Sequence, residues 1–238
     1  MSANSNIGWT DNTFNVAWGC TKISPGCKNC YADTLAARYG HDVFGGKVER
    51  RTFSEKHWAE PLKWNKQGPA RVFCSSMCDI FEDNETVARE LKKLWPLIRQ
   101  TPNLTWQLLT KRADRIAQSL PDDWGDGYPN VWMGTSVESS PYIDRVFWLS
   151  RIPAKVRFIS YEPALGDIAT NINLDGIHWL IYGGESGAAF RQDSDSWCEN
   201  IRDECARAGT AFFFKQRAAF KPGRGTMPDG TTPRAFPK

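Results

Sequence analysis

The chain has 238 residues, a net charge of +3 and seven cysteines. A chain of this length can bury a sizeable core without disulfides, and its small charge does not indicate a strongly basic nucleic-acid binder. No run of about 18 apolar residues is present, so we expect no contact with a membrane interior. The polar start over residues 1–6 lacks an apolar signal segment, so we expect a cytoplasmic protein.

Short apolar runs alternate along the chain with segments of helical spacing. The runs have the length of buried strands and lie at 14–18, 72–75, 104–110, 131–137, 156–161, 178–182 and 211–214. The predicted helices lie at 31–39, 86–99, 112–119, 142–150 and 196–208, and Pro96 is expected to kink the second. This alternation favours a parallel sheet with right-handed crossovers. We therefore predict an α/β fold, a partial (β/α) barrel of six to seven parallel strands, with a doubly wound open sheet as the alternative.

The predicted domain organisation is a single (β/α) barrel over residues 1–220, followed by a Pro/Gly-rich tail over 221–238. The barrel would carry a loop over residues 19–31 that contains three of the cysteines. We expect the tail to be loop or partly disordered, because Pro, Gly and Thr dominate it. Its basic residues offer an alternative, in which the tail folds over a ligand.

Polar residues follow nearly every predicted strand. The carboxyl ends of parallel strands meet at one edge, where ligands of such sheets bind, so we expect one polar site there. In chain order the residues are Cys20, Ser75, Ser76, Thr110, Lys111, Arg112, Ser136, Glu138, Tyr161, Glu162, Gly183, Gly184, Glu185, Lys215 and Gln216.

The crowded cysteines are Cys20, Cys27 and Cys30. In a reducing compartment such crowding favours a metal or cluster site over disulfides. Soft thiolates suit the irons of a [4Fe–4S] cluster, and three of them leave one iron open for a cofactor. The alternative is a zinc site with a fourth ligand from one of the residues Cys74, Cys78 and His41.

With the aromatic Tyr31 directly after its last cysteine, this motif resembles that of radical S-adenosylmethionine enzymes, although six residues separate its first two cysteines instead of three. The longer chain, through residues 7–10, 183–187 and 214–216, is similar to a phage-associated three-cysteine-motif family. The resemblance implies a partial (β/α)6 barrel with the cluster loop after the first strand. It also implies an electron donor for the cluster, and S-adenosylmethionine that is bound at the open iron and cleaved to a 5′-deoxyadenosyl radical.

The superfamily often holds the methionine amino group with a Gly-Gly-Glu segment after the second strand. Here Gly183, Gly184 and Glu185 follow the sixth predicted strand. Glycines permit close backbone approach and Glu185 can accept from an ammonium group, so we expect a cofactor-binding role, with a tight structural turn as the alternative. The other candidates for cofactor binding are Ser75, Ser76, Ser136, Glu138 and Glu162.

Cations gather at the same edge. We expect them to bind phosphate of the substrate, because guanidinium and ammonium groups suit that anion; a solvated charged rim is the alternative. These candidates are Lys111, Arg112, Arg191 and Lys215. Cys78 is the candidate catalytic residue, as a source of a hydrogen atom or a thiyl radical, whereas the remaining cysteines are interpreted as buried hydrophobic residues.

Two hypotheses for the function follow. In the first, the protein is a radical S-adenosylmethionine enzyme that modifies or repairs a nucleic-acid base or nucleotide. In the second, it is a non-catalytic metal- or cluster-containing module that binds nucleic acid or a partner protein. The fourth iron distinguishes them, because an enzyme leaves it open for the cofactor whereas a structural site fills all positions with protein ligands.

Overall fold

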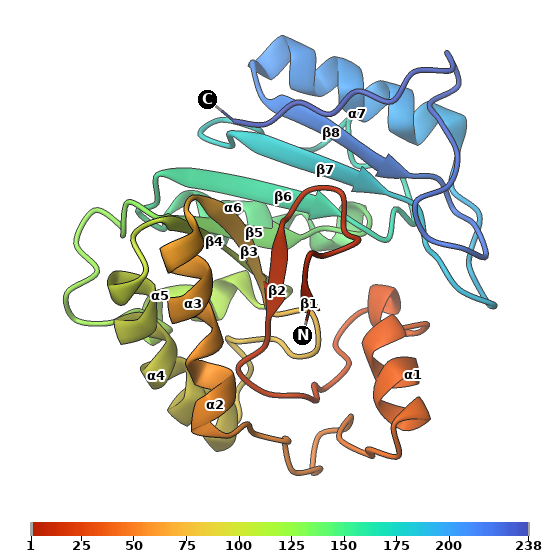
Figure 1. Cartoon of the computed structure of the whole chain (residues 1–238). Helices are drawn as coiled ribbons and strands as arrows, with labels where there is room; N and C mark the ends of the chain where they lie inside the picture. Colours follow the sequence, from red (N-terminus) through yellow and green to blue (C-terminus); the bar gives the residue numbers. More distant parts are fainter. Residues whose placement is uncertain (1, 238) are drawn as a thin grey trace.

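The computed structural model describes residues 2–237 and is built on one eight-stranded sheet whose strands follow one another in chain order (Figure 1). Strand β1 (Ser2–Ala3) pairs antiparallel with β2 (Asn12–Phe14), and every later neighbour is parallel. The others are β3 (Ala70–Cys74), β4 (Leu104–Thr110), β5 (Val131–Ser136), β6 (Val156–Tyr161), β7 (Trp179–Gly183) and β8 (Ala211–Gln216). Seven parallel strands, β2–β8, thus form a curled half-barrel, and the predicted partial (β/α) barrel is confirmed. The doubly wound alternative is wrong, because in that fold the strand order reverses partway.

Helices connect the strands, and all but the first cover the outer face of the curl, whereas the first lies apart from the sheet (Figure 1). They are α1 (Tyr31–Arg38), α2 (Glu55–Trp58), α3 (Glu60–Gln67), α4 (Glu85–Gln100), α5 (Ile116–Ser119), α6 (Asp144–Ser150) and α7 (Asp195–Ala208). Short 3-10 turns lie at η1 (Pro25–Cys27), η2 (Ala113–Arg115) and η3 (Ser140–Tyr142). Helix α4 continues through Pro96 to its end. Its buried side chains include Val87, Leu91, Leu94 and Ile98, the spacing of a helix with one apolar face.

The two faces of the sheet bury different clusters. On β3, Val72 and Cys74 join the large cluster beneath the helices, while Phe73 points to the opposite face. There Trp9, 2% exposed, contacts Phe73 with 4.6 Å between ring centroids and fills the inside of the curl together with aromatic residues of β6–β8. The inside of the half-barrel is therefore packed, so a ligand site is left to the strand ends.

The first predicted strand, 14–18, is misplaced in the sequence interpretation. Strand β2 ends at Phe14, and the next residues form a loop whose Val16 and Ala17 are fully buried. The apolar run reflects a loop that enters the core, which hydrophobic periodicity alone cannot separate from a strand.

The tail runs beside β8. Phe214 N donates to Pro233 O at 2.8 Å and Ala235 N to Phe212 O at 3.0 Å, so residues 233–235 cover the edge of the sheet. Met227 of the tail is 1% exposed and belongs to the main core. Among the helices of residues 2–237, none combines the length and apolar character that crossing a bilayer requires.

Candidate functional site

The cysteine loop, residues 19–31, leaves β2 and leads into α1. Gly19 has a φ of +112°, and a Cβ there would lie 2.1 Å from Val43 O, so the loop can begin this way only with glycine. Cys20, Cys27 and Cys30 are all half-buried, whereas the other four cysteines are buried. The arrows of β6–β8 point toward the side of the molecule where α1 lies (Figure 1).

Thr21 is held from the ends of two strands. Its backbone N donates to Glu82 Oε1 at 2.8 Å, after β3, and its carbonyl accepts from Arg112 Nη2 at 2.9 Å, after β4. The buried Arg50 forms a two-bond pair with Glu82 at 3.0 and 2.9 Å. Burial opposes the charge on Glu82, but hydrogen bonds from Arg50 and Thr21 outweigh it and lower the pKa of Glu82.

Cys20 lies against the same arginine. Arg112 Nη1 is 3.6 Å from Cys20 Sγ and 3.0 Å from Asp79 Oδ2. Asp79 also accepts from Thr110 Oγ1 at 2.6 Å and from the backbone N of Lys111 at 3.0 Å, so its position is fixed. Burial raises the pKa of the Cys20 thiol to about 12, the charge of Asp79 adds to this effect, and Arg112 opposes it.

Glu138, after β5, holds the middle of the loop. Its fully buried carboxylate accepts from Ser24 Oγ at 2.6 Å and pairs with Lys111 Nζ at 3.1 Å and Arg145 Nη1 at 2.7 Å. Burial raises its pKa, but the charges of Lys111 and Arg145 outweigh that effect, so the pKa of Glu138 is lowered. A Cβ at Gly26 would lie 2.5 Å from this carboxylate, so the loop passes directly over it.

Glu185, after β7, holds the end of the loop. It accepts from Asn29 Nδ2 at 3.1 Å and from the backbone N and Nε of Arg191 at 2.8 and 2.9 Å. Asn29 Nδ2 also donates to Ala189 O at 2.7 Å. Four strand ends, those of β3, β4, β5 and β7, therefore fix the cysteine loop across the carboxyl edge of the sheet.

Ser75 and Ser76, predicted to bind the cofactor, form hydrogen bonds with the loop that follows β2. Ser75 Oγ accepts from Val16 N at 3.3 Å, and Ser76 Oγ is 3.2 Å from Asn15 Nδ2. The Ser76 carbonyl also accepts from Tyr31 Oη at 2.8 Å, which ties α1 to this loop. The Ser136 side chain is buried at the end of β5, where the residue's carbonyl accepts from Arg145 Nη1 at 2.7 Å.

Glu162 differs from the other predicted carboxylates. It forms an ion pair with Lys215, and the two side chains are 22% and 20% exposed. A Cβ at Gly183 would lie 2.9 Å from the Glu162 carboxyl carbon, so this glycine makes room for the carboxylate at the end of β7. At Gly184 the close neighbour is backbone, since a Cβ added there would lie 2.1 Å from Ala218 N.

The four predicted substrate-binding cations each have a carboxylate partner. The pairs are Lys111–Glu138, Arg112–Asp79, Arg191–Glu185 and Lys215–Glu162. The edge is therefore a set of ion pairs, and a phosphate would compete with carboxylates that are already in place.

The structure places Cys78 in the main core at 9% exposure, and burial raises its pKa to about 12. Of the other candidates for a fourth zinc ligand, Cys74 is fully buried in the same cluster and the His41 ring packs on Trp18 with 5.6 Å between centroids. In residues 2–237 no three His, Cys, Asp or Glu side chains are grouped so as to hold a single metal ion.

Sequence reasoning missed Arg50, Asp79 and Glu82. The two acidic residues lie just after β3, so the rule that polar strand-end residues form the site could have included them. Arg50 follows no strand, and only its tertiary position in the loop between α1 and α2 reveals its role.

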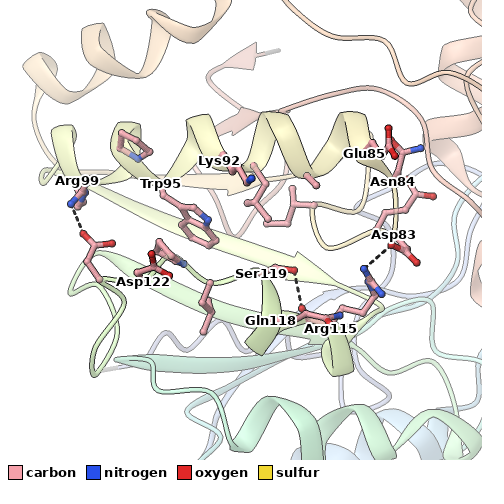
Figure 2. A pocket seen from close by; sticks show the side chains of 18 residues that line it. Asp83, Asn84, Glu85, Lys92, Trp95, Arg99, Arg115, Gln118, Ser119 and Asp122 are labelled. Atoms are coloured by element: carbon pink, nitrogen blue, oxygen red, sulfur yellow. Dashed lines mark hydrogen bonds and ion pairs between the residues drawn. The ribbon is translucent and has the colours of Figure 1, made fainter.

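A separate pocket of about 730 Å³ lies between α4 and α5, outside the half-barrel. Figure 2 shows Trp95 and Lys92 of α4 facing Gln118 and Ser119 across it. The ion pairs Arg99–Asp123 and Arg115–Asp83 lie at its two ends.

Comparisons with known proteins give a family and a fold. Residues 4–232 match the family described as Protein of unknown function (DUF5131). No curated protein sequence gives a match. A solved structure of a spore photoproduct lyase mutant is similar with a TM-score of 0.51 and 13% identity, over 86% of this chain and 63% of that one. A second mutant, with bound AdoMet and dinucleoside spore photoproduct, gives a TM-score of 0.49 and 13% identity over 83% and 62%.

The chain thus spans less than two thirds of the length of these solved structures. At 13% identity, the likeness to the structure with a TM-score of 0.51 is one of fold. The family match, in contrast, extends over nearly the whole chain. The protein therefore belongs to the family described as Protein of unknown function (DUF5131) and has a half-barrel fold like that of spore photoproduct lyase.

Proposed function

We propose that the protein binds a [4Fe–4S] cluster through Cys20, Cys27 and Cys30 and uses S-adenosylmethionine for radical chemistry on a nucleic-acid base or nucleotide. The observation that carries the proposal is the placement of the cysteine loop. Three half-buried thiols lie on one loop, and buried charged groups from four strand ends hold that loop at the ligand-binding edge. Cysteines that only pack in a hydrophobic core would not need charged groups from several strands to fix their loop.

The donor set fits the cluster. Three thiolates are soft ligands for iron, and they leave one iron for the amino and carboxylate groups of the cofactor. Zinc would need a fourth protein ligand, but Cys74 and Cys78 lie in the core and His41 packs on Trp18. We also propose that the chain is related to the phage-associated three-cysteine-motif family, on the similarity of residues 7–10, 183–187 and 214–216.

Glu162 and Lys215 are the best-suited groups for the methionine end of the cofactor. Glu162 can accept from the ammonium group and Lys215 can donate to the carboxylate, once their mutual ion pair opens. Glu138 and Glu185 instead hold the cysteine loop, while Ser75 and Ser76 follow β3 and Ser136 ends β5. When bound, the cluster and S-adenosylmethionine supply hydrogen abstraction by a carbon radical, for which a reduced electron donor is required.

The proposed substrate class rests on exposed aromatic and basic side chains. Tyr31 and Phe220 are 54% and 63% exposed, and exposed aromatic rings can stack on bases. Lys28 lies three residues before Tyr31 and Lys221 directly follows Phe220; both lysines are exposed and can meet phosphate. The fold shared with spore photoproduct lyase agrees with this class.

Anaerobic reconstitution tests the proposal. We expect about four irons and four sulfides per chain, as a [4Fe–4S] cluster requires, and 5′-deoxyadenosine after reduction with S-adenosylmethionine. Cys27→Ala should lose the brown chromophore, while the matched control Cys198→Ala, on the buried face of α7, should keep it. Uptake of zinc with tetrahedral thiolate geometry and no incorporation of iron would contradict the proposal. A cluster that forms but never yields 5′-deoxyadenosine would favour the non-catalytic module.

A further inference from the structure

The Arg112 guanidinium lies in a fixed position against a proposed iron ligand. Its Nη1 is 3.6 Å from Cys20 Sγ, within the range of a hydrogen bond to sulfur. Asp79 at 3.0 Å and the Thr21 carbonyl at 2.9 Å hold the same guanidinium, and Arg112 as a residue is 8% exposed. Within residues 2–237, Arg112 is the one cationic side chain that donates a hydrogen bond to a cysteine sulfur.

Hydrogen bonds to the sulfurs and nearby charge set the reduction potential of an iron–sulfur cluster. The reduced cluster carries one more negative charge, so a cation that donates to a ligand sulfur stabilises it. The effect is strong where water is excluded, since charges interact more strongly there than in bulk water. Asp79 acts in the opposite direction on the same site, because its negative charge lies 3.0 Å from the guanidinium.

We propose that Arg112 is a positioning residue that holds the Cys20 thiolate by an N–H···S hydrogen bond and raises the reduction potential of the bound cluster. This inference rests on the proposed function. It replaces the expectation that Arg112 binds substrate phosphate, because its donors already meet Asp79, Thr21 and Cys20.

Removing either charge of the Arg112–Asp79 pair should shift the midpoint potential of the cluster, and the two substitutions should shift it in opposite directions. Arg112→Gln removes the cation and should make the midpoint potential of the reconstituted cluster more negative. Asp79→Asn removes the anion, keeps a carbonyl acceptor for the guanidinium, and should make the potential more positive. Arg115→Gln is the matched control, because Arg115 pairs with the exposed Asp83 and with Phe81 O; it should leave the potential unchanged. The measurement is a redox titration followed by electron paramagnetic resonance, without S-adenosylmethionine.

Iron retention gives a second readout. Against a chelator, Arg112→Gln should lose iron several-fold faster than wild type, and Arg112→Lys, which keeps the charge, should lose it at an intermediate rate. If Arg112→Gln holds no cluster, the Asp79→Asn potential decides, and a value equal to that of wild type overturns the inference. Wild-type potential and retention in Arg112→Gln would also overturn it while leaving the proposed function intact. Failure of the wild type to take up iron would instead overturn the proposed function itself.

Discussion

Glu138 combines full burial with two cationic partners and a contact to the cysteine loop. Its position after β5 suggested cofactor binding from the sequence, yet its oxygens face Ser24, Lys111 and Arg145. A strand-end position tells where a side chain lies, but its partners come from segments 7 to 114 residues away, and local patterns do not encode them.

Glu138→Gln removes one charge from this buried network and leaves Lys111 and Arg145 without their counter-ion. Breaking a buried pair in this way costs about 3 kcal/mol in the free energy of unfolding, which urea titration measures. The control is Glu60→Gln, which breaks an exposed pair with Lys63 and should leave the free energy of unfolding unchanged. Equal effects of the two substitutions would show that Glu138 is not part of the support of the fold.

The buried side chain of His57 should make the stability of the fold depend on pH. Its ring stacks on Phe53 at 3.9 Å, and its Nε2 lies 2.7 Å from Asn15 O at the end of β2. Burial lowers the pKa of His57 from 6.5 to about 4, against the opposing effect of the Asn15 hydrogen bond. Between these pH values the unfolded chain binds a proton that the folded chain does not, so stability falls as the pH drops from about 6.5 toward 4.

From pH 7 to pH 5 this histidine should remove on the order of 1–2 kcal/mol of stability. The comparison is wild type against His57→Gln, each unfolded with urea at both pH values. The variant should lose less stability over this range than the wild type does. Identical losses would mean that His57 titrates normally in the folded protein.

At the scale of elements, helix α4 begins at a local sequence signal, an N-terminal capping residue. Asn84 Oδ1 accepts from the backbone N of Thr86 and of Val87 at 3.1 and 3.2 Å, which caps a helix of 16 residues. Asn84→Ala should lower the free energy of unfolding by about 1 kcal/mol, and Asn84→Asp, which retains the acceptor, should restore most of it. If alanine and aspartate behave alike in urea titration, the cap does not contribute.

The elements also show where sequence patterns fail. The runs that became β4 and β6 were predicted residue for residue, because strands buried on both faces read as continuous apolar segments. The run at 14–18 looked the same but lies outside β2 in all but its first residue, because Val16 and Ala17 are buried without strand pairing. Helices α2 and α3 were missed, and the break between them at Ala59 leaves each too short for a clear helical period.

At the scale of the whole molecule, strand–helix alternation predicted the parallel half-barrel, and strand direction then predicted the edge at which the cysteine loop lies. The ion-pair network at that edge could not be predicted from the sequence. It joins Glu82 to Arg50 and Arg112 to Asp79 across 32 and 33 residues, and each pair depends on how the strands curl. The fold therefore places the cysteines, and the network of charges keeps their loop in one conformation.

The central claim is that three cysteines bind a cluster whose fourth iron is open to S-adenosylmethionine. The most direct measurement is the electron paramagnetic resonance spectrum of the reduced, reconstituted wild-type protein with and without the cofactor. We predict a [4Fe–4S]⁺ signal that changes when S-adenosylmethionine is added and stays unchanged with the same concentration of 5′-methylthioadenosine, which lacks the amino and carboxylate groups that would bind the open iron. A cluster signal that S-adenosylmethionine leaves unaltered, or no cluster signal at all, would contradict the account.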